Sequence, residues 1–420
     1  MPPPQITRYK PGIEMLAYDV APNVQPQVVY LKAEDGAKSR GLLYSTGKEK
    51  TVVVLIHPRG DVSRHYTIPS VLEADCATFA QESRWPNNDS TASHELILGD
   101  IAAALRFLRQ RFEKIVFLGY SGGGSIYSLY QTQATAAAGQ RLKDTAAGDP
   151  YDLNRYEMPA ADGIIFAAAH LGAGKMLQLE IDPSVVDEAD GLSCDPELDM
   201  YNPDNGFRPP PEESRYSREF LTRYRAAQTA RVTRLDQIAR SQIETQRQFR
   251  SVIEGSEFEQ RPFKEQILLQ RRAMFGQFMQ IFRTDANPAT VDLSIDPSMR
   301  SYGSINSVRP DLSNYIDNGF ARILTPRAWL SLWSGVSSRA SLLDTIPNVT
   351  IPTAVISFLG DNAIHPSAAK ATFAASPAKD KQFIEVAGDH FGFALQQSPH
   401  EGGREGVKAA LVGWLRGRFS

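Results

Sequence analysis

The chain has 420 residues, of which 42% are hydrophobic and 22% charged, so it can bury a large core as one elaborated domain or as two. Its formal net charge of −3 argues against a polyanionic partner such as nucleic acid. The two cysteines, Cys76 and Cys194, provide neither a disulfide framework nor a Cys-His metal site, which favours a reducing, cytoplasmic environment.

The amino-terminal segment carries no targeting signal that we can identify. Residues 1–10 contain three consecutive prolines and no apolar core of signal-peptide length. Elsewhere, no run approaches the roughly 18 apolar residues that a membrane-spanning helix needs. We therefore expect a cytoplasmic protein with no membrane partner.

Eight segments have the composition of β-strands. Glu34-Asp-Gly-Ala37 separates the first two and predicts an antiparallel hairpin. Helical patterns separate most of the later segments, and this alternation predicts a mostly parallel sheet flanked by helices. The predicted strands are 27–33, 39–44, 51–57, 76–80, 115–119, 163–169, 352–358 and 382–386.

The sixth and seventh predicted strands are separated by about 180 residues, far too many for a loop in a compact domain. The acidic, proline-containing stretch 180–204 predicts an irregular segment. Apolar residues then recur at helical spacing over 221–243 and again over 267–282, which predicts two helices. Residues 212–283 carry more basic than acidic side chains, which we assign to solvated helix faces and internal ion pairs. The Phe and Met residues of the second helix are expected to pack against other helices.

A serine flanked by glycines follows the fifth predicted strand, in Gly-Tyr-Ser121-Gly-Gly-Gly. At a tight strand-to-helix turn, a serine hydroxyl is accessible to a base and surrounded by amide N–H groups. The N–H of Gly122 would then face a developing oxyanion. Ordinary turns also carry glycine-flanked serines, so the interpretation depends on the partners that follow.

The last two predicted strands end in residues that could complete this machinery. Asp361 follows the seventh strand and His390 follows the eighth. Together with Ser121 they have the order serine, acid, base. In that scheme His390 takes the serine proton, while Asp361 fixes its tautomer and stabilises the imidazolium. Asp389 is an alternative acid, which we interpret as a turn residue.

The third predicted strand ends in His57-Pro-Arg-Gly60, where a second oxyanion donor is expected. Pro58 has no N–H, so the donor must be the amide of Arg59 or Gly60, and we favour Arg59. His57 itself is interpreted as a residue that closes the end of the strand.

Several further side chains are candidates for binding a substrate. His170 ends the sixth predicted strand at the same sheet edge, and Tyr120 directly precedes the serine. Trp333, one helical turn from Trp329, could form an aromatic wall or pack a helix on the core. His365 either lines the pocket or begins a helix.

These motifs together resemble those of the α/β-hydrolase superfamily. The helix expected at 99–108 and the closing helix at 406–415 are also similar to the family's, and Arg84–Asp89 resembles a segment of some uncharacterised bacterial members. One departure is Pro58, because many relatives have glycine after the corresponding histidine.

The resemblance implies an α/β-hydrolase fold: a mostly parallel eight-stranded sheet flanked by helices, with a mainly helical cap inserted between two strands. The hydrolase core would comprise residues 1–170 and 349–420, and the cap or lid residues 171–348. A lid of this size argues for a substrate larger than a short acyl ester.

The implied activity is that of a serine hydrolase, which cleaves a carboxylic ester or lactone through an acyl-enzyme. The substrate would be a medium-sized, partly apolar small molecule, and no metal or organic cofactor is implied. The same three residues also serve hydrolysis of a carbon–carbon bond in a β-diketone or ring-cleavage product. A ligand-binding protein that has kept the scaffold and lost turnover is a further alternative. The paired helices of the insertion could instead form a homodimer interface.

Overall fold

The computed structural model of the chain describes residues 24–317, 319–395 and 402–419. Eight strands form one sheet in the order β1-β2-β4-β3-β5-β6-β9-β10. The strands β1 and β2 form the predicted hairpin and β2 pairs antiparallel with β4, whereas the other neighbours are parallel. The bounds are β1 Gln27–Lys32, β2 Lys38–Tyr44, β3 Thr51–Ile56, β4 Ala77–Gln81, β5 Lys114–Tyr120, β6 Gly163–Ala167, β9 Thr353–Phe358 and β10 Lys381–Val386. The predicted fold class is confirmed.

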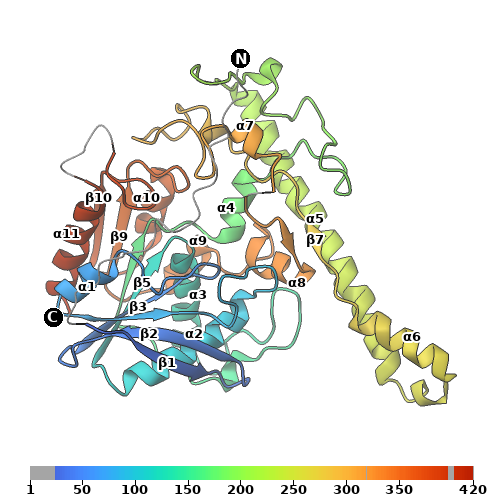
Figure 1. The fold of residues 1–420 in the computed structure, drawn as a ribbon, viewed down its shortest axis with the longest axis horizontal. Helices are drawn as coiled ribbons and strands as arrows, with labels where there is room; N and C mark the ends of the chain where they lie inside the picture. Colours follow the sequence, from blue (N-terminus) through green and yellow to red (C-terminus); the bar gives the residue numbers. More distant parts are fainter. Residues whose placement is uncertain (1–23, 318, 396–401, 420) are drawn as a thin grey trace.

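Helices cover both faces of this sheet (Figure 1). The central strand β3 is buried along its whole length, so its alternate residues enter two different cores. Val52, Val54 and Ile56 pack with α2, α3, α9 and α10, whereas Val53 and Leu55 pack with α1 and α11. The bounds of these helices are α1 Ile68–Glu73, α2 His94–Arg109, α3 Gly122–Thr135, α9 Leu342–Thr345, α10 Pro366–Ala375 and α11 Gly403–Arg416.

The long insertion lies between β6 and β9 in the chain, as predicted. Its largest element is the helix α5, which extends away from the sheet, with α6 packed beside its far end (Figure 1). The stretch from the end of α4 to the short turn Pro203–Asn205 is irregular, in agreement with the sequence. The elements are α4 Ala173–Glu180, α5 Arg218–Glu254, α6 Phe263–Met274, β7 Met279–Gln280, α7 Pro310–Ser313, β8 Ile323–Leu324, α8 Pro326–Ala328 and the π-helical turn Trp329–Trp333.

The second helix of the insertion is shorter than predicted. It ends at Met274, and the strand β7 follows, so the prediction of a helix up to residue 282 is wrong. Met279 and Ile281 are buried whereas Gln280 is exposed, which is the two-residue period of a strand. The expected packing of the aromatic side chains is also wrong, because Phe275 and Phe278 are 64% and 59% exposed.

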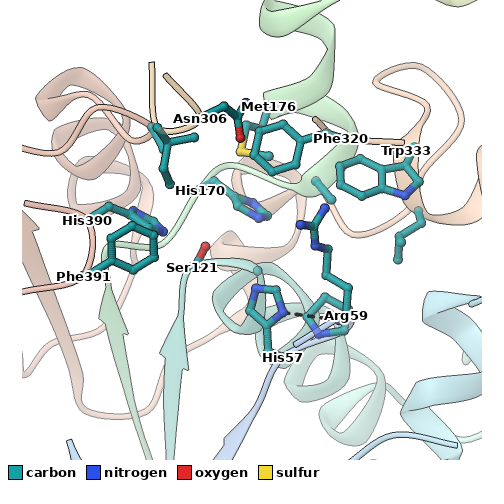
Figure 2. Close-up of a pocket in the computed structure, with 16 residues that line it drawn as sticks. His57, Arg59, Ser121, His170, Met176, Asn306, Phe320, Trp333, His390 and Phe391 are labelled. Atoms are coloured by element: carbon teal, nitrogen blue, oxygen red, sulfur yellow. Dashed lines mark hydrogen bonds between the residues drawn. The ribbon is translucent and has the colours of Figure 1, made fainter. Parts of the chain in front are cut away.

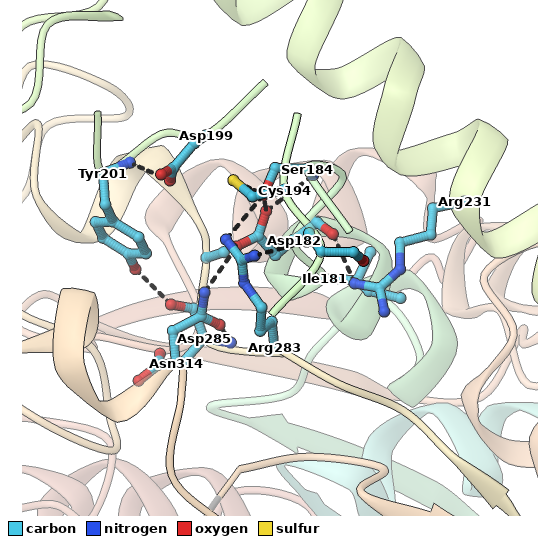
Figure 3. Close-up of polar contacts among 12 residues, drawn as sticks. Ile181, Asp182, Ser184, Cys194, Asp199, Tyr201, Arg231, Arg283, Asp285 and Asn314 are labelled. Atoms are coloured by element: carbon cyan, nitrogen blue, oxygen red, sulfur yellow. Dashed lines mark hydrogen bonds and ion pairs between the residues drawn. The ribbon is translucent and has the colours of Figure 1, made fainter. Parts of the chain in front are cut away.

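Buried charges join the long helix α5 to irregular segments of the insertion (Figure 3). Arg283 pairs with Asp182 at 2.7 Å, and both side chains are almost fully buried. Arg231 of α5 donates to the carbonyl oxygen of Asp182 and pairs with Glu188 at 2.8 Å. Basic residues of the helix therefore pair internally with the acidic stretch that precedes it.

We expect the substitution Asp182→Asn to destabilise the fold by about 3–5 kcal/mol, because it leaves the buried charge of Arg283 without a counter-ion. Urea unfolding of both proteins measures the difference. The matched control is Glu265→Gln, which removes the exposed Arg261–Glu265 pair and should cost less than about 1 kcal/mol. Equal losses in the two variants would contradict the assignment of a stabilising role to the buried pair.

Among the residues that the structure describes, no helix is long and apolar enough to cross a membrane. Residues 1–23, which include the proline-containing amino-terminal segment, lie outside the described residues.

Candidate active site

Ser121 lies at a sharp turn between β5 and α3. Its φ of +49° is unusual for a residue with a side chain, and its amide donates to the carbonyl of Ala167 at 3.1 Å. A Cβ at Gly119 would lie 2.5 Å from the Cα of Gly124, and one at Gly123 would lie 2.4 Å from the carbonyl oxygen of Ile56. The glycines on either side of the serine are therefore required by close backbone packing.

Asp361 and His390 are brought together although 29 residues separate them. The Nδ1 of His390 lies 2.8 Å from Oδ2 of Asp361, and both side chains are buried. The other carboxylate oxygen of Asp361 accepts the amides of Ala363 and Ile364 at 2.7 and 2.8 Å, which fixes the orientation of the carboxylate.

The pKa of His390 reflects this arrangement. Burial disfavours the imidazolium, but the charge of Asp361 and its hydrogen bond outweigh burial, and the pKa is raised above its ordinary value. A histidine held in this way can accept a proton near neutral pH.

The three residues follow three parallel strands in the order serine, aspartate, histidine, and they lie at one edge of the sheet. A strained serine between a strand and a helix, followed along the chain by an acid and a histidine after later strands, defines one architecture. The chain has the α/β-hydrolase fold. The resemblance stated from the sequence is therefore confirmed at the level of the fold.

The chain resembles known proteins only distantly. No protein-family model and no curated protein matches the chain. Solved structures similar to it include DcsB in complex with its substrate analogue, at 12% identity over 94% of this chain and 99% of that chain, with a TM-score of 0.49. They also include the α/β hydrolase GrgF from Penicillium sp. sh18, at 9% identity over 94% and 99%, with a TM-score of 0.47. The Pyrococcus furiosus esterase Pf2001 is 9% identical over 94% and 92%, with a TM-score of 0.44. At these values the fold assignment depends on the topology described above.

Ser121 and His390 line the same small cavity of this α/β-hydrolase-fold protein, which has a volume of about 90 Å³. Figure 2 shows the hydroxyl of Ser121 pointing into it, between the rings of His390 and His170. The remaining walls are mostly apolar. The lining residues are His57, Pro58, Arg59, Ser121, Gly122, His170, Ala173, Met176, Ile305, Asn306, Phe320, Leu332, Trp333, Ala363, His390 and Phe391.

Two further histidines line this cavity as neutral side chains. Burial lowers the pKa of His57 well below its ordinary value, and the nearby charges of Arg59 and other histidines add to the effect. Burial also lowers the pKa of His170 to about 3. His170 thus lies in the cavity, where the sequence suggested it, and His57 faces the same space although it was interpreted as closing a strand.

The amide of Arg59, which was expected to face an oxyanion, donates instead to Nδ1 of His57 at 3.3 Å (Figure 2). This contact fixes the tautomer of His57. Because Nδ1 accepts a hydrogen bond and the ring is neutral, the ring proton must be on Nε2. That nitrogen lies beside Gly122, since a Cβ added to Gly122 would be 3.1 Å from it.

The side chain of Arg59 forms part of the cavity wall with two aromatic rings. Its guanidinium lies 5.0 Å from the ring centre of Phe320 and 5.4 Å from that of Trp333. Trp333 therefore lines the cavity, as one of the two predictions for it proposed. Trp329 packs inside the insertion instead, where its Nε1 donates to Asp236 at 2.7 Å.

Tyr120 is placed differently from its prediction as a substrate-binding residue. It is not among the residues that line the cavity, because its side chain is buried in the core with Tyr66 and Phe358, with its ring centre 6.0 Å from that of His390. Its hydroxyl donates to the carbonyl oxygen of His390 and accepts a hydrogen bond from Tyr66 at 3.2 Å. Asp389 accepts the amides of Phe391 and Phe393, as a turn residue does.

Several lining residues had no signal in the sequence. Ile305, Asn306 and Phe320 come from irregular parts of the insertion, where no periodicity indicates which side chains point inward. Phe391 could have been suspected only from its position next to His390. Within the described ranges, no group of three or more metal-ligating side chains could hold a metal ion.

Proposed function

We propose that the chain is a serine hydrolase that cleaves carboxylic esters or lactones through an acyl-enzyme. The observation that carries this proposal is the buried Asp361–His390 pair in the same cavity as a serine held at a strained turn. The raised pKa of His390 suits a general base that operates near neutral pH.

In the proposed reaction, the Oγ of Ser121 attacks the ester carbonyl while His390 takes its proton. The tetrahedral intermediate collapses, the acyl–oxygen bond breaks, and His390 returns the proton to the leaving alcohol. Water then attacks the acyl-enzyme by the same steps in reverse, which releases the acid and restores the serine. The role of Asp361 is to keep the proton on Nδ1 of His390, so that Nε2 is free to accept the serine proton.

The developing oxyanion requires hydrogen-bond donors near the serine. The amide of Gly122, at the start of α3, is one donor. For the second, Arg59 offers its N–H only if the contact with His57 breaks. The Nε2–H of His57 is the donor that this geometry leaves available beside Gly122. We therefore propose His57 as the second donor in place of the amide of Arg59.

Substitution of His57 tests this assignment. We expect His57→Leu to lower kcat by a factor of about 10²–10³ with little change in KM, because an oxyanion donor acts mainly in the transition state. His57→Gln, whose amide can still donate, should recover part of the loss. Steady-state kinetics with an aryl ester measures both. An unchanged kcat in His57→Leu would return the role to Arg59.

We also propose that residues 171–348 form a cap over a hydrolase core made of residues 1–170 and 349–420. Side chains of the insertion, including Met176, Phe320 and Trp333, contribute to the apolar wall of the cavity, which supports this division. Such a wall excludes water and favours a medium-sized, partly apolar substrate. A cytoplasmic location and a homodimer remain predictions from the sequence.

The experiment that tests the proposed function is turnover of a graded set of aryl esters, from acetyl to long and aromatic acyl groups, combined with labelling by a fluorophosphonate. We expect hydrolysis, and mass spectrometry should locate the phosphonyl group on Ser121. The preferred chain length would report the space available to the acyl group. No turnover and no labelling would contradict the proposal. If the protein hydrolyses none of the esters but cleaves a β-diketone, it is a carbon–carbon bond hydrolase.

A further inference from the structure

A second and much larger cavity, of about 620 Å³, adjoins the one that contains Ser121. His170, Met176 and Ala363 line both cavities, so these side chains form the partition between them. Figure 2 shows His170 and Met176 above the serine. The smaller cavity, at about 90 Å³, holds only a small part of a typical ligand, for which 300–1,000 Å³ is about the usual range. The remainder of a substrate must extend elsewhere, and the larger cavity is adjacent.

The larger cavity is also lined by an arginine without an acidic partner. Arg225 of α5 is partly buried, and it donates to the carbonyl oxygen of Leu179 at 3.0 Å, to Gln228 at 2.8 Å and to Asn287 at 2.7 Å. All three acceptors are neutral. Within the described ranges, no carboxylate oxygen lies within 4.0 Å of this guanidinium.

The fully buried arginines of the insertion differ from Arg225. Arg231 and Arg283 each have a carboxylate partner, at 2.8 and 2.7 Å respectively, and Figure 3 shows Arg283 facing Asp182. Arg300 is also buried and donates only to neutral groups, among them the carbonyl oxygens of Ala289 and Ile295, but it does not line the cavity. Arg225 combines the lack of a carboxylate partner with a position on the cavity wall.

Glu180 lies near enough to Arg225 for their charges to interact, but the two residues form no ion pair within 4.0 Å. Its carboxyl accepts a hydrogen bond from Asn287 at 3.0 Å, and burial, assisted by the charge of Asp285, raises its pKa to about 8. At pH 7 it is therefore mostly protonated. Burial also lowers the pKa of Arg225, and the charges of Tyr224 and Glu180 offset this effect only in part.

Among the described residues, the remaining charged groups of the cavity form no ion pair with Arg225. Asp296 accepts the amide of Ser367 at the start of α10, and Asp344 is exposed in α9. Lys175, on the exposed side of α4, donates to the carbonyl oxygen of Gly335 at 2.7 Å. The buried end with Arg225 and Asn287 is thus the part of the cavity suited to an anion.

We propose that this cavity binds a carboxylate at the far end of the substrate, in contact with Arg225. The inference deepens the proposed function, since it makes the substrate an ester or lactone that bears a second, ionised carboxyl group remote from the reacting carbonyl. A planar guanidinium matches a carboxylate in a bidentate geometry, and hydrogen bonds between charged groups are stronger than neutral ones. The scissile carbonyl lies at Ser121 while the chain passes His170 and Met176, and the flexible thioether of Met176 can adapt to it.

Matched pairs of substrates test the proposal. We would measure p-nitrophenyl hemiesters of dicarboxylic acids, from succinate to sebacate, against p-nitrophenyl esters of monocarboxylic acids of the same chain length. For at least one length, the hemiester should have a KM lower by about tenfold, with a similar kcat. Arg225→Met should abolish this difference, so that hemiesters and neutral esters of the same length have equal KM values. Arg225→Gln, which can still bond to the carbonyl of Leu179, serves if Arg225→Met does not fold. The matched control is Arg223→Met, an exposed arginine of the same helix that does not line the cavity.

A second readout does not depend on turnover. Free suberate should raise the melting temperature of the wild-type protein and of Arg223→Met, but not that of Arg225→Met. If no ester is hydrolysed, the proposed function fails while this measurement still tests the cavity. Equal KM values for charged and neutral esters together with no effect of suberate would overturn the inference. Stabilisation by inorganic phosphate but not by suberate would overturn the assignment to a carboxylate.

Discussion

If the proposed function is correct, the variant Ser121→Ala is expected to lose aryl-ester hydrolysis by a factor on the order of 10⁶ in kcat, as removal of the nucleophilic serine does in subtilisin. The reason is that no other hydroxyl replaces the serine at the turn between β5 and α3, where its side chain points into the cavity beside His390 (Figure 2). Rates of wild type and variant on the same esters, measured side by side, provide the test.

The matched control for this variant is Ser125→Ala. Ser125 is also a buried serine of α3, but it does not line the cavity, and its hydroxyl only contacts the carbonyl oxygen of Gly122 at 3.4 Å. It should retain activity close to that of the wild type. Without its nucleophile, the protein could still accelerate hydrolysis slightly by binding the oxyanion. Hydrolysis by Ser121→Ala at a rate well above that residual level would exclude an acyl-enzyme on Ser121.

Asp361→Asn should lower kcat by about 10⁴-fold without unfolding the protein. One oxygen of Asp361 accepts the amides of Ala363 and Ile364, so the carbonyl oxygen of an asparagine would turn to these donors. Its NH₂ group would then face Nδ1 of His390. Nδ1 would become an acceptor, the ring proton would move to Nε2, and His390 could no longer take the proton of Ser121.

The pH dependence adds an independent readout for Asp361→Asn. Activity requires neutral His390, so in the wild type kcat/KM should fall as the pH drops through the raised pKa of this histidine, above about 6.5. Without the charge of Asp361, burial lowers that pKa, and the acidic limb should move to lower pH. Asp389→Asn is the control, since Asp389 only accepts turn amides near His390. Unchanged kinetics in Asp361→Asn would assign the acid to another carboxylate.

The positions of the strands could be predicted because their signals are local. A buried parallel strand such as β3 is a continuous apolar run. Ser121 directly follows the similar run of β5, and Asp361 follows that of β9 after a short turn, whereas His390 follows the less buried edge strand β10. The common sheet edge then follows from parallel topology alone. The end of α6 at Met274 could have been suspected from Gly276, but the helical spacing of the later aromatic residues concealed it.

The rest of the site depends on contacts between distant parts of the chain. The cavity beside Arg225 is built from residues between His170 and Ala368, and the missing partner of that arginine becomes visible only when its three neutral acceptors are known. Similarly, the proton on His57 depends on one amide contact that no sequence pattern specifies. Such features require the fold, because neither the spacing nor the type of these residues distinguishes them from ordinary packing residues.

The positive φ angle of Ser121 indicates that this residue was not selected for stability. A φ of +49° is readily adopted by glycine, whereas in other residues such conformations cost about 1–3 kcal/mol. Since glycines already occupy positions 119 and 122–124, a glycine at 121 would extend an existing run and relieve that strain. The free energy of unfolding of natural proteins is small, so a residue that lowers it is retained only if it contributes something else. In a sequence selected for thermal stability alone, we would expect glycine and not serine at position 121.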